Sequence, residues 1–169
     1  MDKAREQAGT FTRQPNSRHC FVCGVESPVG LRLCFADNGV DEVRATYTVR
    51  SEYQGYPGIV HGGIVAAMLD EVGGRTVMIG HPNRFFMTAK MEIRYRQPVP
   101  TDTPLTLIGR PVRDRGRLVQ AHSEIRLPDG AIAAEADLTL VEIPPEYVPD
   151  ADFEALGWKV YPDEVCTNE

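Results

Sequence analysis

His61-Gly-Gly-Ile-Val-Ala-Ala-Met-Leu-Asp70-Glu71 is the most informative stretch of the chain, because it places a carboxylate inside an otherwise apolar helix. We expect this helix to run from about Gly62 to Ile79. It is apolar nearly all round, and such a helix is wrapped by other structure instead of lying on a surface.

The first turn of this helix is almost bare backbone. Gly62 and Gly63 have no side chains to cover the N–H groups that a helix leaves unpaired at its N-terminus, so these donors can face a ligand. Asp70 follows two turns later, on nearly the same face. A carboxylate there is costly unless it has a partner or a function. Donors and acid together indicate polarisation of a carbonyl group and attack on it.

Length and charge exclude several classes of protein. The 169 residues suit one domain, or a small subunit that completes its core in an oligomer. Three charged residues interrupt the longest apolar region, about residues 59–79, so we expect no membrane span. The polar N-terminus lacks the apolar core of a secretory signal, so we expect a cytoplasmic protein. A net charge of −6 argues against general nucleic-acid binding.

The remaining pattern predicts strands on both sides of the helix. We expect a polar, mobile or loosely docked arm over residues 1–18, one domain over 19–143, and a Pro-containing tail with a short helix over 144–169. The predicted strands are Leu31–Ala36, Glu42–Val49, Met87–Arg96, Leu105–Val112, Arg117–Leu127 and Ala131–Ile143. In the strand that follows the helix, alternation places Met87 and Met91 on one face and Thr88 on the other, polar face.

A long helix against an antiparallel sheet is fully covered only if the sheet curls around it, and that arrangement is the hotdog fold. The chain carries Pro57-Gly-Ile-Val-His-Gly-Gly, then Leu69-Asp70, then Thr88-Ala-x-Met-x-Ile-x-Tyr95. In these residues it resembles the hotdog-fold acyl-CoA thioesterases of the phenylacetate-pathway and human THEM type. The resemblance covers roughly residues 20 to 143. It implies an α+β hotdog fold with a sheet of about six strands.

The resemblance also implies roles for individual residues. Asp70 matches the catalytic carboxylate, as general base or nucleophile, and Gly62 matches the donor of the oxyanion N–H. His61 matches a positioning residue, and Thr88 matches the Ser or Thr that orients the attacking water. Asp70 and Gly62 of one site come from different subunits in that family, which implies a homodimer or homotetramer. The residues alone leave alternatives open: a tethered buried acid, a packed helix start, a loop histidine and an ordinary strand threonine.

Substrate contacts are predicted at four further places. Gly63 lies beside the oxyanion donor, and Gln54 lies in the loop where some relatives carry a polar group. Arg110, Arg113, Arg115 and Arg117 cluster at a hairpin turn of an acidic chain. Arg115 and Arg117 are the candidates for binding the phosphates of coenzyme A, although a solvated turn is the simpler reading. We expect Glu71 and Arg75 to form an i, i+4 pair on the helix face that stabilises the helix by about 0.3 kcal/mol.

The four cysteines are Cys20, Cys23, Cys34 and Cys166. Cys20-x-x-Cys23, preceded by His19, would suit zinc, but a closed structural site needs four ligands and no second pair follows at a suitable spacing. We therefore expect a compact turn with reduced thiols, no metal, no cofactor and no disulfide.

Hydrolysis of an acyl-CoA thioester is the function that these residues favour. Hydration of acyl thioesters on this fold would need a histidine five residues after Asp70, where the chain has Arg75. The alternative from another class is a non-catalytic acyl-CoA-binding or sensing protein, which would be expected to lack Asp70.

Overall fold

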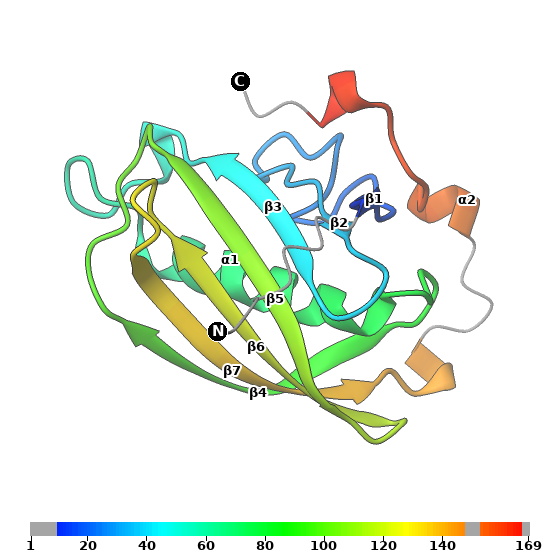
Figure 1. Ribbon diagram of the computed structural model, residues 1–169. Coiled ribbons are helices and arrows are strands. Elements are labelled where there is room, and N and C mark those ends of the chain that lie inside the picture. Colours follow the sequence, from blue (N-terminus) through cyan, green and yellow to red (C-terminus); the bar gives the residue numbers. More distant parts are fainter. Residues whose placement is uncertain (1–9, 148–152, 167–169) are drawn as a thin grey trace.

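The computed structural model describes residues 10–147 and 153–166, whose strands form one antiparallel sheet. Its order is β1-β2-β3-β5-β6-β7-β4, so β4 lies at an edge (Figure 1). The strands are β1 Thr12–Arg13, β2 Ala36–Asp37, β3 Val43–Thr48, β4 Phe86–Tyr95, β5 Pro104–Asp114, β6 Leu118–Arg126 and β7 Ile132–Glu142. The helices are η1 Ser51–Tyr53, α1 Gly62–Gly74, η2 Arg75–Met78, η3 Pro145–Tyr147, α2 Phe153–Leu156 and η4 Asp163–Val165.

Helix α1 crosses one face of the curved sheet (Figure 1), which confirms the predicted hotdog architecture. Its apolar residues Val65, Met68, Leu69 and Val72 are buried against the strands. The contact is close: a Cβ added to Gly109 of β5 would lie 2.2 Å from the carbonyl oxygen of Val72. The predicted helix extends to Ile79, whereas the α-helix ends at Gly74 and η2 continues the chain as a tighter turn.

Strand β4 contains a bulge that changes which residues face the helix. Thr88 pairs with Leu140 and Lys90 with Thr139, so Ala89 is the extra residue. The alternation therefore reverses at this point, and Thr88 shares the helix-facing side with Met91. The prediction that Thr88 lies on the opposite, polar face is wrong for this reason.

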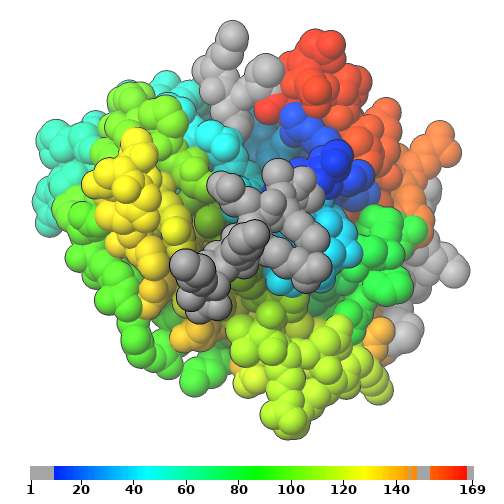
Figure 2. Space-filling model, in the orientation of Figure 1, coloured from blue at the N-terminus to red at the C-terminus, as the bar shows by residue number. Residues whose placement is uncertain are grey.

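The segments before β3 and at the C-terminus are packed onto the domain. Asn16 is 1% exposed and donates hydrogen bonds to the carbonyl oxygens of Cys23 and Leu33, both at 2.7 Å. The described part of the predicted arm, residues 10–18, is therefore docked; residues 1–9 lie outside the described chain. Figure 2 shows the C-terminal residues, in red, beside the first described residues, in blue. Of the predicted strand 31–36, only Ala36 is in a strand.

The tail holds the short helix α2 within the range predicted for one, although residues 148–152 lie outside the described chain. Phe153 stacks on Phe85 with ring centroids 5.8 Å apart, and Trp158 meets Phe85 edge-on at 5.3 Å.

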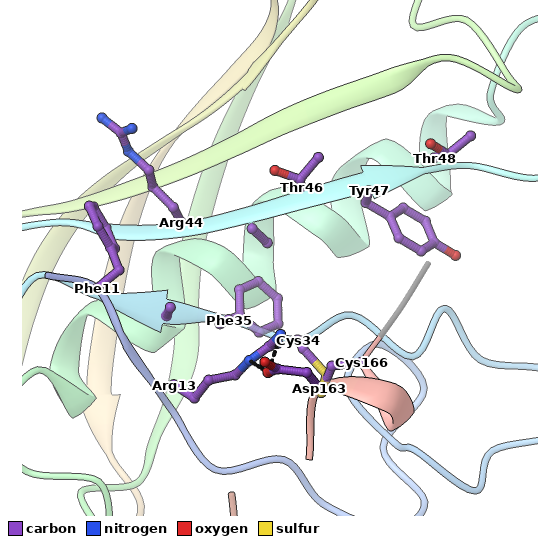
Figure 3. A pocket seen from close by; sticks show the side chains of 12 residues that line it. Phe11, Arg13, Cys34, Phe35, Arg44, Thr46, Tyr47, Thr48, Asp163 and Cys166 are labelled. Carbon is purple, nitrogen blue, oxygen red and sulfur yellow. Dashed lines mark hydrogen bonds and ion pairs between the residues drawn. A yellow bond between two sulfur atoms is a disulfide. The ribbon is translucent and has the colours of Figure 1, made fainter. Parts of the chain in front are cut away.

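A disulfide joins Cys34 to Cys166, which contradicts the expectation of reduced thiols throughout. The two cysteines are 132 residues apart in sequence, and packing of the tail beside β2 brings them together. The two cysteines line a groove of about 630 Å³ between β3 and the terminal segments (Figure 3). None of the predicted site residues lines this groove.

Candidate active site

Asp70 and Thr88 meet between α1 and the edge strand. The Thr88 hydroxyl donates a 2.6 Å hydrogen bond to Oδ1 of Asp70. Thr88 is exposed and Asp70 only partly buried, so the carboxylate lies at an accessible surface. Among the described residues, none donates a hydrogen bond to Oδ2. One carboxylate oxygen is therefore oriented and the other is open to water or to a carbonyl carbon.

The N-terminus of α1 leaves one backbone donor open. His61 is the N-cap, and its Nδ1 accepts a 3.0 Å hydrogen bond from the Gly63 N–H. No described residue accepts a hydrogen bond from the Gly62 N–H, which is exposed at the positive end of the helix dipole. A Cβ on Gly62 would make only an ordinary 3.7 Å contact with the Tyr95 hydroxyl. Packing within this chain therefore does not require a glycine at position 62.

Tyr95 is a residue of this region that the sequence analysis did not select. Its hydroxyl donates a 2.9 Å hydrogen bond to the Gly62 carbonyl oxygen and so ties the first turn of α1 to the end of β4. Tyr95, Gly62 and Val65 line a hollow of about 300 Å³. Its place at the end of the alternating strand, on the face of Met91, was the signal available in the sequence.

One chain does not bring the Asp70 carboxylate and the Gly62 N–H together. Gly62 and Asp70 are eight residues apart on one helix, which corresponds to about 12 Å along the axis. That separation is too large for both groups to contact the same carbonyl.

Comparison with known proteins finds a family match over this part of the chain. The family model of the thioesterase superfamily matches residues 57–134, which include α1, β4 and both candidate groups. Over these residues the chain is similar to the thioesterase superfamily. No curated protein matches it.

Solved structures of thioesterase-superfamily proteins share the fold. One crystallised member is 35% identical, with a TM-score of 0.67 over 74% of this chain and 61% of its own. Zebra fish thioesterase superfamily member 2 is 16% identical, with a TM-score of 0.62 over 70% of this chain and 90% of its own. A hypothetical thioesterase from Streptococcus pneumoniae, crystallised with coenzyme A, is 22% identical, with a TM-score of 0.56 over 60% of this chain and 81% of its own. The last two likenesses concern the fold alone.

Gln54 stabilises the loop before helix α1. Its side-chain oxygen accepts a 3.1 Å hydrogen bond from the Gly58 N–H, where the backbone has a positive φ of 75°. The side-chain oxygen of Gln54 is thus engaged in the loop, and its NH₂ group remains available to donate a hydrogen bond to a substrate.

The four arginines of the predicted cluster do not form one basic patch. Arg110 binds Glu42 at 2.6 Å on the outer face of the sheet, and Arg117 binds Glu142 at 3.2 Å. Arg115 is exposed at the β5–β6 turn and makes no ion pair with a described residue. Of the two predicted phosphate ligands, Arg115 is therefore the one with its charge available.

Glu71 and Arg75 form a buried pair, not the surface pair that the sequence predicts. The Arg75 side chain is 2% exposed, and its Nε donates to Glu71 Oε1 at 3.0 Å. Burial raises the pKa of Glu71 to about 7, although the guanidinium of Arg75 opposes this shift. Removing one member of such a pair costs about 3–5 kcal/mol, well above the tenths expected for a surface pair.

No helix that the structure describes is long and apolar enough to span a membrane. A cytoplasmic location stays a prediction.

Proposed function

We propose that this chain hydrolyses acyl-CoA thioesters to a free acid and CoA. The hydrogen bond between Thr88 and Asp70 is the observation that carries the proposal. Asp70 acts as general base for a water molecule that attacks the thioester carbonyl, or attacks the carbonyl directly to form an anhydride that water then hydrolyses. In both cases the thiolate of CoA leaves. Thr88 orients the carboxylate through Oδ1 and leaves Oδ2 to react.

The Gly62 N–H is the proposed oxyanion donor, and His61 shapes the turn that presents it. Since this amide has no partner among the described residues, it does not have to give up a protein hydrogen bond when the carbonyl oxygen arrives. A positioned donor of this kind contributes about 10²–10³ in rate. The match to the thioesterase superfamily and the coenzyme A bound to the similar streptococcal protein support acyl-CoA as the substrate class.

Two copies of this chain complete each site in this proposal. The separation of Gly62 and Asp70 requires a second helix to supply one of them, and β4 provides the place for it. This strand pairs only with β7 among the described strands, although it is ten residues long and exposes Met87 and Tyr95. An unpaired edge of this kind readily pairs with another chain.

Release of CoA from a panel of short, long and aromatic acyl-CoAs tests the activity. We expect turnover in the wild type and a loss of about a hundredfold or more in Asp70→Asn. Asp137→Asn is the matched control, because Asp137 is an exposed aspartate on the opposite face of the sheet. Binding of acyl-CoA without release of CoA from any member would instead identify a non-catalytic binder or sensor.

Mixing two inactive variants tests the shared site. Gly62→Pro lacks the oxyanion N–H and Asp70→Asn lacks the acid. If each site takes the two groups from different chains, a mixed dimer contains one intact site. Denaturing and refolding the variants together should then restore about a quarter of wild-type activity. No recovery in dimers shown to be mixed would mean that both groups act from one chain.

A further inference from the structure

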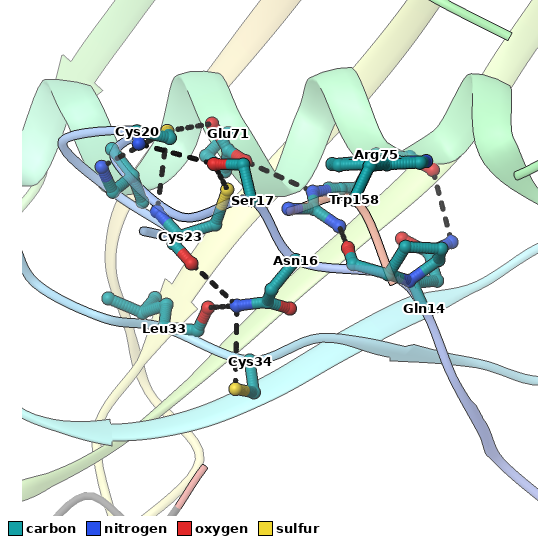
Figure 4. A network of polar contacts seen from close by, with 12 residues as sticks. Gln14, Asn16, Ser17, Cys20, Cys23, Leu33, Cys34, Glu71, Arg75 and Trp158 are labelled. Carbon is teal, nitrogen blue, oxygen red and sulfur yellow. Dashed lines mark hydrogen bonds and ion pairs between the residues drawn. The ribbon is translucent and has the colours of Figure 1, made fainter. Parts of the chain in front are cut away.

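Residues 20–24 form a turn that directs backbone donors at a sulfur atom (Figure 4). The N–H groups of Val22 and Cys23 point at Cys20 Sγ, at 3.3 and 3.4 Å. The Gly24 N–H binds the Cys20 carbonyl oxygen at 2.8 Å. A Cβ on Gly24 would lie 2.3 Å from that oxygen, so the turn requires glycine. Donors arranged in this way stabilise a thiolate, which is the form of cysteine that binds metals.

A carboxylate from helix α1 lies close to the sulfur atoms of Cys20 and Cys23. Glu71 follows Asp70 directly in α1, and its Oε2 is 3.9 Å from Cys20 Sγ. The ligand atoms of Cys20, Cys23 and Glu71 all lie within 4.8 Å of one another. A carboxylate beside thiolates is repelled unless a proton or a cation lies between them.

We propose that Cys20, Cys23 and Glu71 bind a zinc ion, with water in the fourth position. Two thiolates and one carboxylate are ligands that zinc accepts in tetrahedral geometry. Tetrahedral ligands at ordinary zinc distances are about 3.5–3.8 Å apart. The three atoms lie within 4.8 Å of one another, so shifts of about 1 Å would bring them to that spacing. His19, the residue before the pair, is exposed and is not among the clustered ligand atoms.

Arg75 gives the site its orientation and its charge balance. It holds Glu71 Oε1 at 3.0 Å, which leaves Oε2 to face the sulfurs (Figure 4). Hydrogen bonding of the non-ligating oxygen is a common feature of metal-bound carboxylates. The three anionic ligands are balanced by the dication together with the buried guanidinium, so the loaded site carries no net charge.

The consequence is structural. The ion joins the loop of residues 17–24 to the helix at the position after Asp70, without contacting the acid itself. Cys20 and Glu71 are 51 residues apart in sequence, so the ion would close a large loop and stabilise the fold.

Metal content tests the proposal without reference to activity. We expect about one zinc ion per chain in protein that is produced without a polyhistidine tag and desalted. Inductively coupled plasma mass spectrometry measures this content. Cys20→Ser and Glu71→Gln should each lose most of it. Glu146→Gln, at an exposed position in η3, is the matched control and should keep it.

Cobalt provides a second measurement that needs no variant. Co²⁺ added to the chelator-treated, reduced wild type should produce a sulfur-to-cobalt charge-transfer band that saturates at about one equivalent. Absence of zinc together with absence of this band would overturn the proposal, as would zinc retained in both variants. A Cys20–Cys23 disulfide with no metal uptake after reduction would overturn it in favour of a redox pair.

Discussion

The Thr88 hydroxyl and the Asp70 carboxylate join the edge strand β4 to helix α1 through a 2.6 Å hydrogen bond. The contact exists because the bulge at Ala89 turns Thr88 toward the helix. A bulge next to an active site commonly re-aims one side chain, and here it re-aims the side chain that holds the proposed catalytic carboxylate.

Replacing Thr88 tests that role. Thr88→Ala removes the donor and should lower kcat by about 10–100-fold, because the carboxylate loses its orientation. Thr88→Ser keeps the hydroxyl and should retain most of the activity. Steady-state kinetics on the best acyl-CoA of the panel measure both. Equal rates for Thr88→Ala and the wild type would show that the hydrogen bond does not serve the reaction.

Gly62→Pro isolates the backbone donor. Proline is well tolerated at the first position of a helix, and the preceding His61 has φ −58° and ψ 135°, which suits a residue before proline. We expect an unfolding free energy within about 1 kcal/mol of the wild type, but a loss of about 10²–10³ in kcat. Gly62→Ala keeps the N–H and should lose much less. Thermal unfolding and kinetics on the three proteins make the comparison, and the same loss in both variants would point to crowding instead of a lost donor.

Arg115 should act on the nucleotide part of the substrate. Arg115→Ala is expected to raise KM for acyl-CoA by about 3–10-fold, since it removes one charged contact to phosphate. KM for the matching acyl-pantetheine, which has no nucleotide, should not change. Arg126→Ala, at the other end of β6, is the control. A KM increase that is equal for both substrates would contradict a phosphate contact.

The Cys34–Cys166 disulfide should stabilise the whole fold. It closes a loop of 132 residues, and removing such a bond typically costs about 2–5 kcal/mol. The double variant Cys34→Ser/Cys166→Ser should therefore lose this much unfolding free energy in denaturant titration. The wild type measured with a reducing agent should match the variant. Identical midpoints with and without the reducing agent would show that the bond does not form in solution.

The architecture followed well from the sequence because its evidence is local. The helix of residues 62–74 has a continuous apolar pattern and a bare first turn, and the long strands alternate with clear turns between them. Short strands such as β1 and β2 were not recognised, since two residues carry no period. The segment 31–35 is mostly buried and apolar without being a strand. Periodicity does not distinguish a buried irregular segment of this kind from a buried strand.

The position of Asp70 on an apolar helix that begins at Gly62 can be predicted from the sequence, because both residues belong to one element and their spacing is local. Tertiary structure decided which groups meet across elements. The direction of Thr88 depends on how β4 pairs with β7, and the approach of Glu71 to Cys20 depends on how a distant loop packs on α1. Periodicity reports neighbours two to four residues apart, whereas these contacts span 18 and 51 residues and exist only once the sheet has closed around the helix.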